Sequence, residues 1–121
     1  MLRHAQEGLP NEACGILGGR ASQPTRFCPA NNAEKSPTRY VVDPKDQLRI
    51  MRELDDADLD MLGIFHSHTH TQAYPSSTDI NLAANWPDAY YVIASLMADE
   101  PVLRAFRIVS GKVTEEPITY E

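Results

Sequence analysis

"MLGIFHSHTHTQAYPSSTD", residues 61–79, joins an apolar run to a cluster of histidines and ends on an aspartate. Met61 to Phe65 is continuously apolar, which is typical of a central strand that is covered on both faces. Alternate residues of a strand point to the same face, so His66 and His68 would lie side by side where this strand ends. The stretch therefore predicts a central strand with two imidazoles at its end.

Helices and strands alternate around this strand. The remaining segments with a helix or strand pattern are a short amphipathic helix over 1–8, a buried strand over 13–17 stopped by Gly18-Gly19, a strand near 25–29, a strand over 40–42, a helix from Asp43-Pro44, a helix over 77–86, and strands over 89–96, 102–109 and 112–119. The predicted fold class is mixed α/β, with helices around one curved sheet that ends in antiparallel hairpins.

The helix after Asp43-Pro44 has a distinct start signal. Aspartate is a preferred N-cap residue, and proline is favoured at the first helical position. An apolar stripe is expected from residues that recur every three positions, namely Leu48, Met51, Leu54 and Ala57.

Composition limits the kind of protein. A length of 121 residues predicts one domain, and a net charge of −6 makes nucleic acid an unexpected partner, because a phosphate-backbone binder needs a basic face. No apolar run approaches the ~20 residues of a membrane span, and the N-terminal MLRHAQEGLP lacks the apolar stretch of a signal peptide. Cys14 and Cys28 lack CxxC spacing and are expected as reduced thiols. We therefore expect a cytoplasmic protein with no membrane partner.

His66 and His68, together with Asp79, form a candidate metal site. Asp79 follows His68 by eleven residues, in the first turn of the next predicted helix, and two imidazoles with one carboxylate suit a catalytic zinc with a fourth position for water. The alternative is that the histidines are surface residues, that Ser76 caps the helix, and that Asp79 complements the helix dipole. Spacing alone leaves both interpretations open.

Two further residues bear on this site. Glu12 directly precedes the buried strand Ala13–Leu17, where it is either a solvated loop residue or the general base that a zinc hydrolase requires. His70 could reach the same strand face as a substrate contact, or it is a bystander.

These residues together resemble a known metalloprotease pattern. Glu12, then His66-Ser67-His68, seven residues, Ser76, two residues and Asp79 are similar to the JAMM (MPN-plus) motif, and NEACGILGG, NNAEKSPTRYVVDP and AYPSSTD extend the likeness over nearly the whole chain. The chain looks most like the small bacterial Mec-type peptidases, which release cysteine from a ubiquitin-like sulfur carrier. Thr69 stands where the eukaryotic deubiquitinases usually have proline.

The resemblance implies specific roles. His66, His68 and Asp79 would hold one Zn²⁺ per chain with a bound water, Glu12 would be the acid/base, and Ser76 would stabilise the oxyanion. Ser67 would point to the opposite face and be structural.

It also implies a single MPN/JAB domain over residues 1–121 with a cytidine-deaminase-like fold. The expected substrate is the amide after the Gly-Gly-type tail of a small sulfur-carrier protein. A general isopeptidase for ubiquitin-like modifiers and a noncatalytic MPN scaffold remain as alternatives. Relatives usually have a strand and a longer helix before NEACG, so we expect apolar surface near the N-terminus to be covered in a homodimer.

Overall fold

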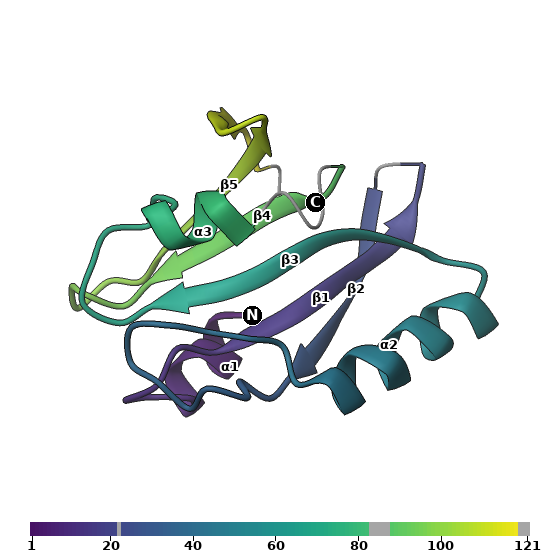
Figure 1. Ribbon diagram of the computed structural model, residues 1–121, viewed down its shortest axis with the longest axis horizontal. Helices are drawn as coiled ribbons and strands as arrows, with labels where there is room; N and C mark the ends of the chain where they lie inside the picture. Colours follow the sequence, from purple (N-terminus) through teal and green to yellow (C-terminus); the bar gives the residue numbers. More distant parts are fainter. Residues whose placement is uncertain (22, 83–87, 119–121) are drawn as a thin grey trace.

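One mixed sheet forms the centre of the protein (Figure 1). The structure is a computed structural model that describes residues 1–21, 23–82 and 88–118. Within these ranges the elements are α1 (Leu2–Glu7), β1 (Cys14–Arg20), β2 (Gln23–Ala30), α2 (Pro44–Asp56), β3 (Asp60–His68), α3 (Ser77–Leu82), β4 (Tyr90–Ser95), β5 (Val102–Val109) and β6 (Lys112–Glu116). The strand order is β2-β1-β3-β4-β5-β6, with β3 and β4 parallel and all other neighbours antiparallel.

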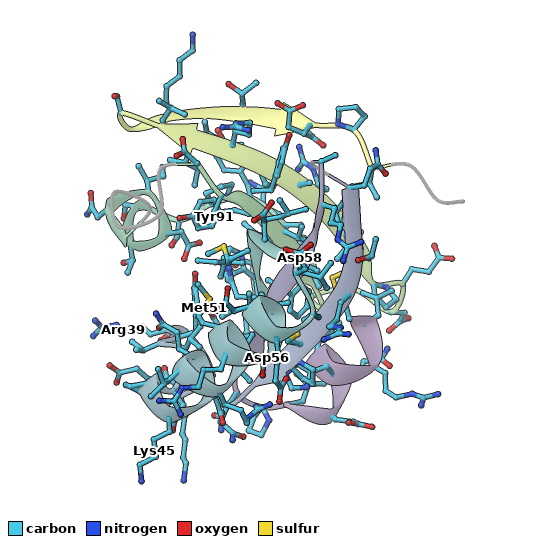
Figure 2. All side chains as sticks on the ribbon, turned by 90° about the vertical axis from the view of Figure 1, so that its right-hand side faces the viewer. Arg39, Lys45, Met51, Asp56, Asp58 and Tyr91 are labelled. Carbon is cyan, nitrogen blue, oxygen red and sulfur yellow. The ribbon has the colours of Figure 1, made fainter. Side chains whose placement is uncertain are left out.

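The predicted central strand is confirmed. β3 lies between β1 and β4, and Ile64 and Phe65 are buried on its opposite faces. Phe65 packs in one cluster with Ala5 of α1, whereas Ile64 packs with Ile80 of α3 on the other face. Figure 2 shows α1 and α3 on opposite sides of the curved sheet. The expected arrangement of helices around one sheet is therefore present.

The prediction that Gly18-Gly19 stops the first strand is wrong. β1 continues to Arg20, and its pairing shifts register at these glycines, between Leu17 and Gly18 against β3 and between Gly18 and Gly19 against β2. A Cβ atom at Gly18 would collide with the Leu54 side chain, and one at Gly19 would collide with the backbone carbonyl of Gln23. The glycines thus allow close packing within a bulged strand instead of ending it.

The segment before α2 also differs from the prediction. Residues 40–42 form no strand, and the described pairing is a single bridge between Asn32 and Val42. The Asn32 side chain takes the place of a strand ladder, because its amide donates to the carbonyl of Arg39 and accepts from the N–H of Val41.

Helix α2 starts as predicted, with the Asp43 carboxylate accepting from the N–H of Lys45 at 2.9 Å. The predicted stripe is wrong at Leu48, which is 55% exposed, while Ile50 and Leu54 are buried. A helix has 3.6 residues per turn, so a strict three-residue spacing drifts around its surface. A spacing of four keeps Ile50 and Leu54 on the sheet side.

The C-terminal half agrees with the expected hairpins. β4, β5 and β6 pair antiparallel in sequence order, and β5 ends at a turn where Ser110 and Gly111 both have positive φ. Residues 83–86 of the second expected helix and residue 119 of the last expected strand lie outside the described residues. Among the helices that the structure describes, none has the length and apolar character needed to span a membrane.

Candidate metal centre

Three side chains from two elements converge on one point. His66 and His68 come from the end of β3, and Asp79 comes from the first turn of α3. The two Nε2 atoms are 3.1 Å apart, and Asp79 Oδ2 lies 3.2 Å from His66 Nε2 and 3.1 Å from His68 Nε2. The structure thus brings together all three residues that the sequence indicated as ligands.

The spacing of these three atoms fits a small metal ion. Zinc–nitrogen and zinc–oxygen bonds of ~2.0–2.2 Å in a tetrahedral site place neighbouring ligand atoms roughly 3.3 Å apart. The observed triangle has sides of 3.1–3.2 Å. His66, His68 and Asp79 are at most 6% exposed, so burial of this polar group is costly unless its charges and lone pairs are paired. The donor set therefore suits zinc with one coordination position left open.

The sheet register brings Glu12 beside this triangle, although 54 positions separate it from His66. Cys14 of β1 pairs with His66 of β3, and the N–H of Ser67 donates to the carbonyl of Ala13 at 3.0 Å. The same register continued by one residue places Glu12 opposite His68. A carboxylate oxygen of Glu12 and ring nitrogens of both histidines lie within 4.8 Å of one another. Glu12 is buried, at 6% exposure, so it is not the solvated loop residue that the sequence left open.

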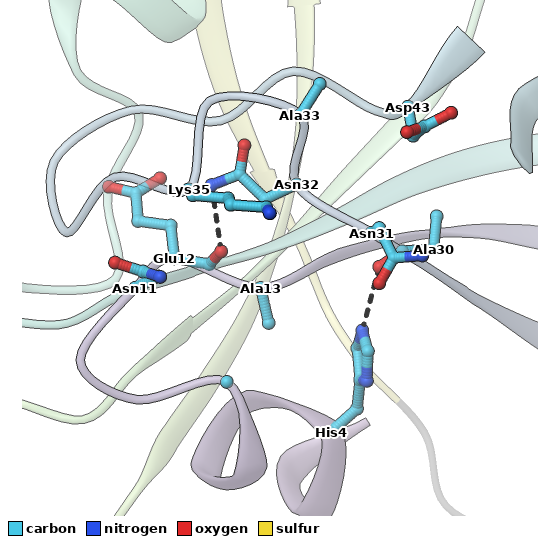
Figure 3. A pocket seen from close by; sticks show the side chains of 11 residues that line it. His4, Asn11, Glu12, Ala13, Ala30, Asn31, Asn32, Ala33, Lys35 and Asp43 are labelled. Atoms are coloured by element: carbon cyan, nitrogen blue, oxygen red, sulfur yellow. Dashed lines mark hydrogen bonds between the residues drawn. The ribbon is translucent and has the colours of Figure 1, made fainter. Parts of the chain in front are cut away.

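The backbone of Glu12 is fixed on both sides (Figure 3). Its N–H donates to the carbonyl of Ser36 at 2.8 Å, and its carbonyl accepts from the Asn32 side-chain amide at 3.0 Å. Next to it lies a cavity of about 570 Å³, whose lining includes Glu12, Asn11 and Lys35. Glu12 therefore lies both beside the two histidines and on the wall of this cavity.

Ser67 connects the segment that contains Glu12 to β3, the strand that carries both histidines. Its hydroxyl oxygen accepts from the N–H of Ala13 at 2.8 Å, in a buried position on the face opposite the histidines. This hydrogen bond fits the structural role expected for Ser67. It holds Ala13, the residue next to Glu12, against the strand that carries both histidines.

Burial and neighbouring charges shift the acidities in different directions. Burial raises the pKa of Glu12 from 4.5 to about 7, and nearby Asp79 adds to this while His68 opposes it. Burial would also raise the pKa of Asp79, but contacts with His66 and His68 outweigh it and hold that pKa well below its usual range. The same site thus holds one ionised carboxylate and one carboxylate that titrates near neutrality.

The histidines differ as well. Burial lowers the pKa of His66, so its imidazole is neutral, the form that binds a metal. Burial acts the same way on His68, but the hydrogen bonds to Asp79 and to the Gln72 carbonyl outweigh it and raise the pKa. A metal ion would therefore compete with a proton at His68.

Ser76 and Asp79 form a reciprocal helix cap. The N–H of Asp79 donates to Ser76 Oγ at 3.1 Å, and the N–H of Ser76 donates to Asp79 Oδ2 at 2.9 Å. The helix cap of the alternative is confirmed, but its surface histidines are wrong, because His66 and His68 are buried. The cap does not compete with the metal hypothesis, because the capping oxygen of Asp79 is the one that faces both histidines. Ser76 is exposed, and its Oγ is the acceptor in this cap.

His70 lies where one of the two sequence interpretations put it, whereas Tyr40 does not. β3 ends at His68, and His70 is exposed outside the cluster, as expected for a bystander. Tyr40, which sequence reasoning placed in a strand, instead stacks its ring on the His66 imidazole with centroids 4.3 Å apart. No spacing signal relates residue 40 to residue 66, so this contact could not have been read from the sequence.

Comparison with known proteins shows the family to which the chain belongs. The model for prokaryotic homologs of the JAB domain matches residues 1–109, so the chain is a member of that family and carries the expected JAB/MPN domain.

The chain is 48% identical to the CysO-cysteine peptidase of Mycobacterium tuberculosis over 98% of its own length and 82% of that protein. It is 35% identical to the desampylase of Haloferax volcanii, over 78% of this chain and 73% of that protein. A solution structure of a Desulfitobacterium hafniense protein superimposes with a TM-score of 0.88 at 42% identity, covering 98% of this chain and 84% of the other. The resemblance seen in the sequence is thus confirmed at the level of family and fold.

Proposed function

We propose that this chain is a JAMM-type zinc peptidase that hydrolyses the amide bond after the C-terminal tail of a small ubiquitin-like sulfur carrier and releases cysteine. The observation that carries the proposal is the buried triangle of His66, His68 and Asp79 with the Glu12 carboxylate beside it. The 48% identity to a CysO-cysteine peptidase supports the substrate, and a role in cysteine biosynthesis follows from that product.

We assign Asp79 rather than Glu12 to the metal. Glu12, His66 and His68 also form a group of three donors, but their atoms are separated by up to 4.8 Å, whereas the Asp79 set is within 3.2 Å. The ionised state of Asp79 suits a ligand, and the pKa of about 7 at Glu12 suits a group that both accepts and donates protons near neutral pH.

The chemistry divides between the metal and the chain. When bound, zinc supplies Lewis-acid activation of the water and of the scissile carbonyl. Glu12 takes a proton from the attacking water while the water oxygen bonds to the carbonyl carbon. Glu12 then gives that proton to the leaving nitrogen as the C–N bond breaks. The hydroxyl of Ser76 donates to the oxyanion that develops on the carbonyl oxygen. Water is consumed, and a carboxylate and an amine are formed.

The proposed partner is a carrier protein with a flexible, glycine-ended tail. The cavity beside Glu12 offers room for part of an extended chain. We place the reaction in the cytoplasm, which agrees with the two free, buried thiols of Cys14 and Cys28. A homodimer that covers apolar surface near the N-terminus belongs to the same proposal, and exposed Met1 and Leu9 support it.

A general isopeptidase is the second candidate, favoured by the 35% identity to a desampylase. Zinc-loaded protein should be given equal amounts of carrier–cysteine and carrier–lysine adducts, and the products weighed by mass spectrometry. We expect faster loss of cysteine. Faster loss of the lysine conjugate would favour the isopeptidase, and intact adducts of both kinds would leave the scaffold function.

A further inference from the structure

The two histidines of the metal centre are held in different ways. His68 Nδ1 lies 2.9 Å from the backbone carbonyl of Gln72, which accepts its N–H and fixes the ring. His66 Nδ1 is buried and has no hydrogen-bond partner anywhere in residues 1–21, 23–82 and 88–118. Metal-binding histidines usually have such a partner on the second ring nitrogen, and it sets the orientation of the ring. The orientation of His66 therefore has another cause.

Tyr40 supplies the contact that is missing at His66. The two rings are nearly parallel, with an angle of 15° and centroids 4.3 Å apart. Cys14 of β1 and Ile93 of β4 flank His66 in the sheet, so its backbone is fixed and its ring can turn only about the side-chain bonds. An aromatic ring stacked on the imidazole restricts that turning, because any tilt would drive the two rings into each other.

The segment that carries Tyr40, residues 37–41, is itself held in place, and it is called the Tyr40 segment below. The Asn32 amide donates to the carbonyl of Arg39 at 2.9 Å and accepts from the N–H of Val41 at 3.0 Å, so one side chain grips the backbone on both sides of Tyr40. The same amide nitrogen donates to the carbonyl of Glu12 at 3.0 Å. Asn32 thus links the residue stacked on His66 to the segment that carries the proposed acid/base.

The end of the histidine strand holds this segment as well. The buried Thr69 hydroxyl donates to the carbonyl of Pro37 at 2.8 Å. Thr69 is the position where this chain departs from the eukaryotic members of the JAMM pattern. The Tyr40 segment is therefore attached at Thr69, which directly follows the strand that bears His66.

We propose that Tyr40 is a positioning residue whose ring holds the His66 imidazole with Nε2 directed at His68 and Asp79. The inference rests on the proposed metal centre and goes beyond it, since Tyr40 contacts the ligand His66 and is not itself a ligand. Tyr40 thus orients the ring of His66, as the hydrogen bond to the Gln72 carbonyl orients the ring of His68. The flat ring does this work, so the hydroxyl of Tyr40 is dispensable.

Metal affinity tests this role without any substrate. The probe is Co²⁺, whose dissociation constant and visible absorption bands report the ligand geometry. We expect Tyr40→Leu to raise the dissociation constant about 10- to 100-fold, the usual cost of removing a group that orients a ligand, and to alter the Co²⁺ bands. Tyr40→Phe should match the wild type in both measurements. Tyr90→Leu, which removes a tyrosine of β4 that stacks under Arg107, is the control and should also match.

Circular dichroism of the metal-free variants establishes that each one is folded. If Tyr40→Leu does not fold, Tyr40→Met fills the same space with a flexible chain, and it should lose affinity in the same way. A folded Tyr40→Leu or Tyr40→Met variant with wild-type Co²⁺ affinity and wild-type bands would overturn the role of Tyr40. Wild-type protein that binds no Co²⁺ would instead overturn the metal centre itself, so the two failures are distinguishable.

Discussion

Replacement of Glu12 by glutamine separates metal binding from proton transfer. Glu12 is 6% exposed, and its carboxylate lies beside the ring nitrogens of His66 and His68. Glutamine has nearly the same volume and cannot accept the proton, so Glu12→Gln should fold, retain zinc and lose turnover. A positioned general base usually contributes about 10²- to 10⁴-fold, which is the loss that we expect.

The same variant makes a second prediction, on stability. Burial raises the pKa of Glu12 from 4.5 to about 7, so the folded state binds this proton at a higher pH than the unfolded state does. The carboxyl therefore costs no stability below pH 4.5, and its ionisation increasingly destabilises the fold as pH rises from 4.5 through 7. A shift of this size corresponds to about 3 kcal/mol, and partial solvation reduces this to about 1–2 kcal/mol. Metal-free Glu12→Gln should be more stable than wild type by that amount at pH 8.

Three measurements on matched samples check the reasoning. They are zinc content by elemental analysis, the rate of cysteine release from a carrier–cysteine adduct, and urea unfolding of the metal-free proteins at pH 5 and pH 8. Full activity with full zinc would refute the role of Glu12 as acid/base. Loss of zinc from Glu12→Gln would contradict the ligand assignment, because it would place Glu12 among the metal ligands.

Three further predictions concern neighbouring residues. Asp79→Ala should lose most of its zinc in elemental analysis, since two histidines alone seldom retain a catalytic ion; wild-type zinc content would contradict this. Ser76→Ala should slow turnover by up to about 10²- to 10³-fold. It should also lower the free energy of unfolding by ~1 kcal/mol, because the Ser76 hydroxyl oxygen caps α3. A variant equal to wild type in both turnover and stability would remove both roles. Burial raises the pKa of the Cys14 thiol from 9.0 to about 12, so it should stay protonated and resist iodoacetamide at pH 8.5 in the folded protein, and labelling at the rate of the unfolded chain would show that it is accessible.

Local signals predicted the parts of the fold that depend on few long-range contacts. The apolar run before His66 identified the central strand, and Asp43-Pro44 identified the start of α2. His66, His68 and Asp79 were recognisable because strand alternation and a helix-capping pattern position each side chain locally. In the structure their side-chain atoms converge to within 3.2 Å of one another, and the role of this group as a metal site stays a prediction.

Long-range packing decided the features that the sequence did not predict. Gly18-Gly19 has the appearance of a strand end, yet the nearness of Leu54 and of Gln23 explains why glycine is needed inside β1. Tyr40 and Val42 are good strand residues, but Asn32 satisfies the backbone around them, and the Tyr40 ring is used against His66 instead. Such contacts between segments far apart in sequence leave no periodic pattern.

The position of the metal is the most direct test of the central claim. Crystals grown with zinc and without chelator should be measured on both sides of the zinc absorption edge. One anomalous peak per chain should lie roughly 2.0–2.2 Å from His66 Nε2, from His68 Nε2 and from a carboxylate oxygen of Asp79, with Glu12 beside the ion and not bound to it. The absence of a peak at that point, or a peak bound by Glu12 in place of Asp79, would contradict the account.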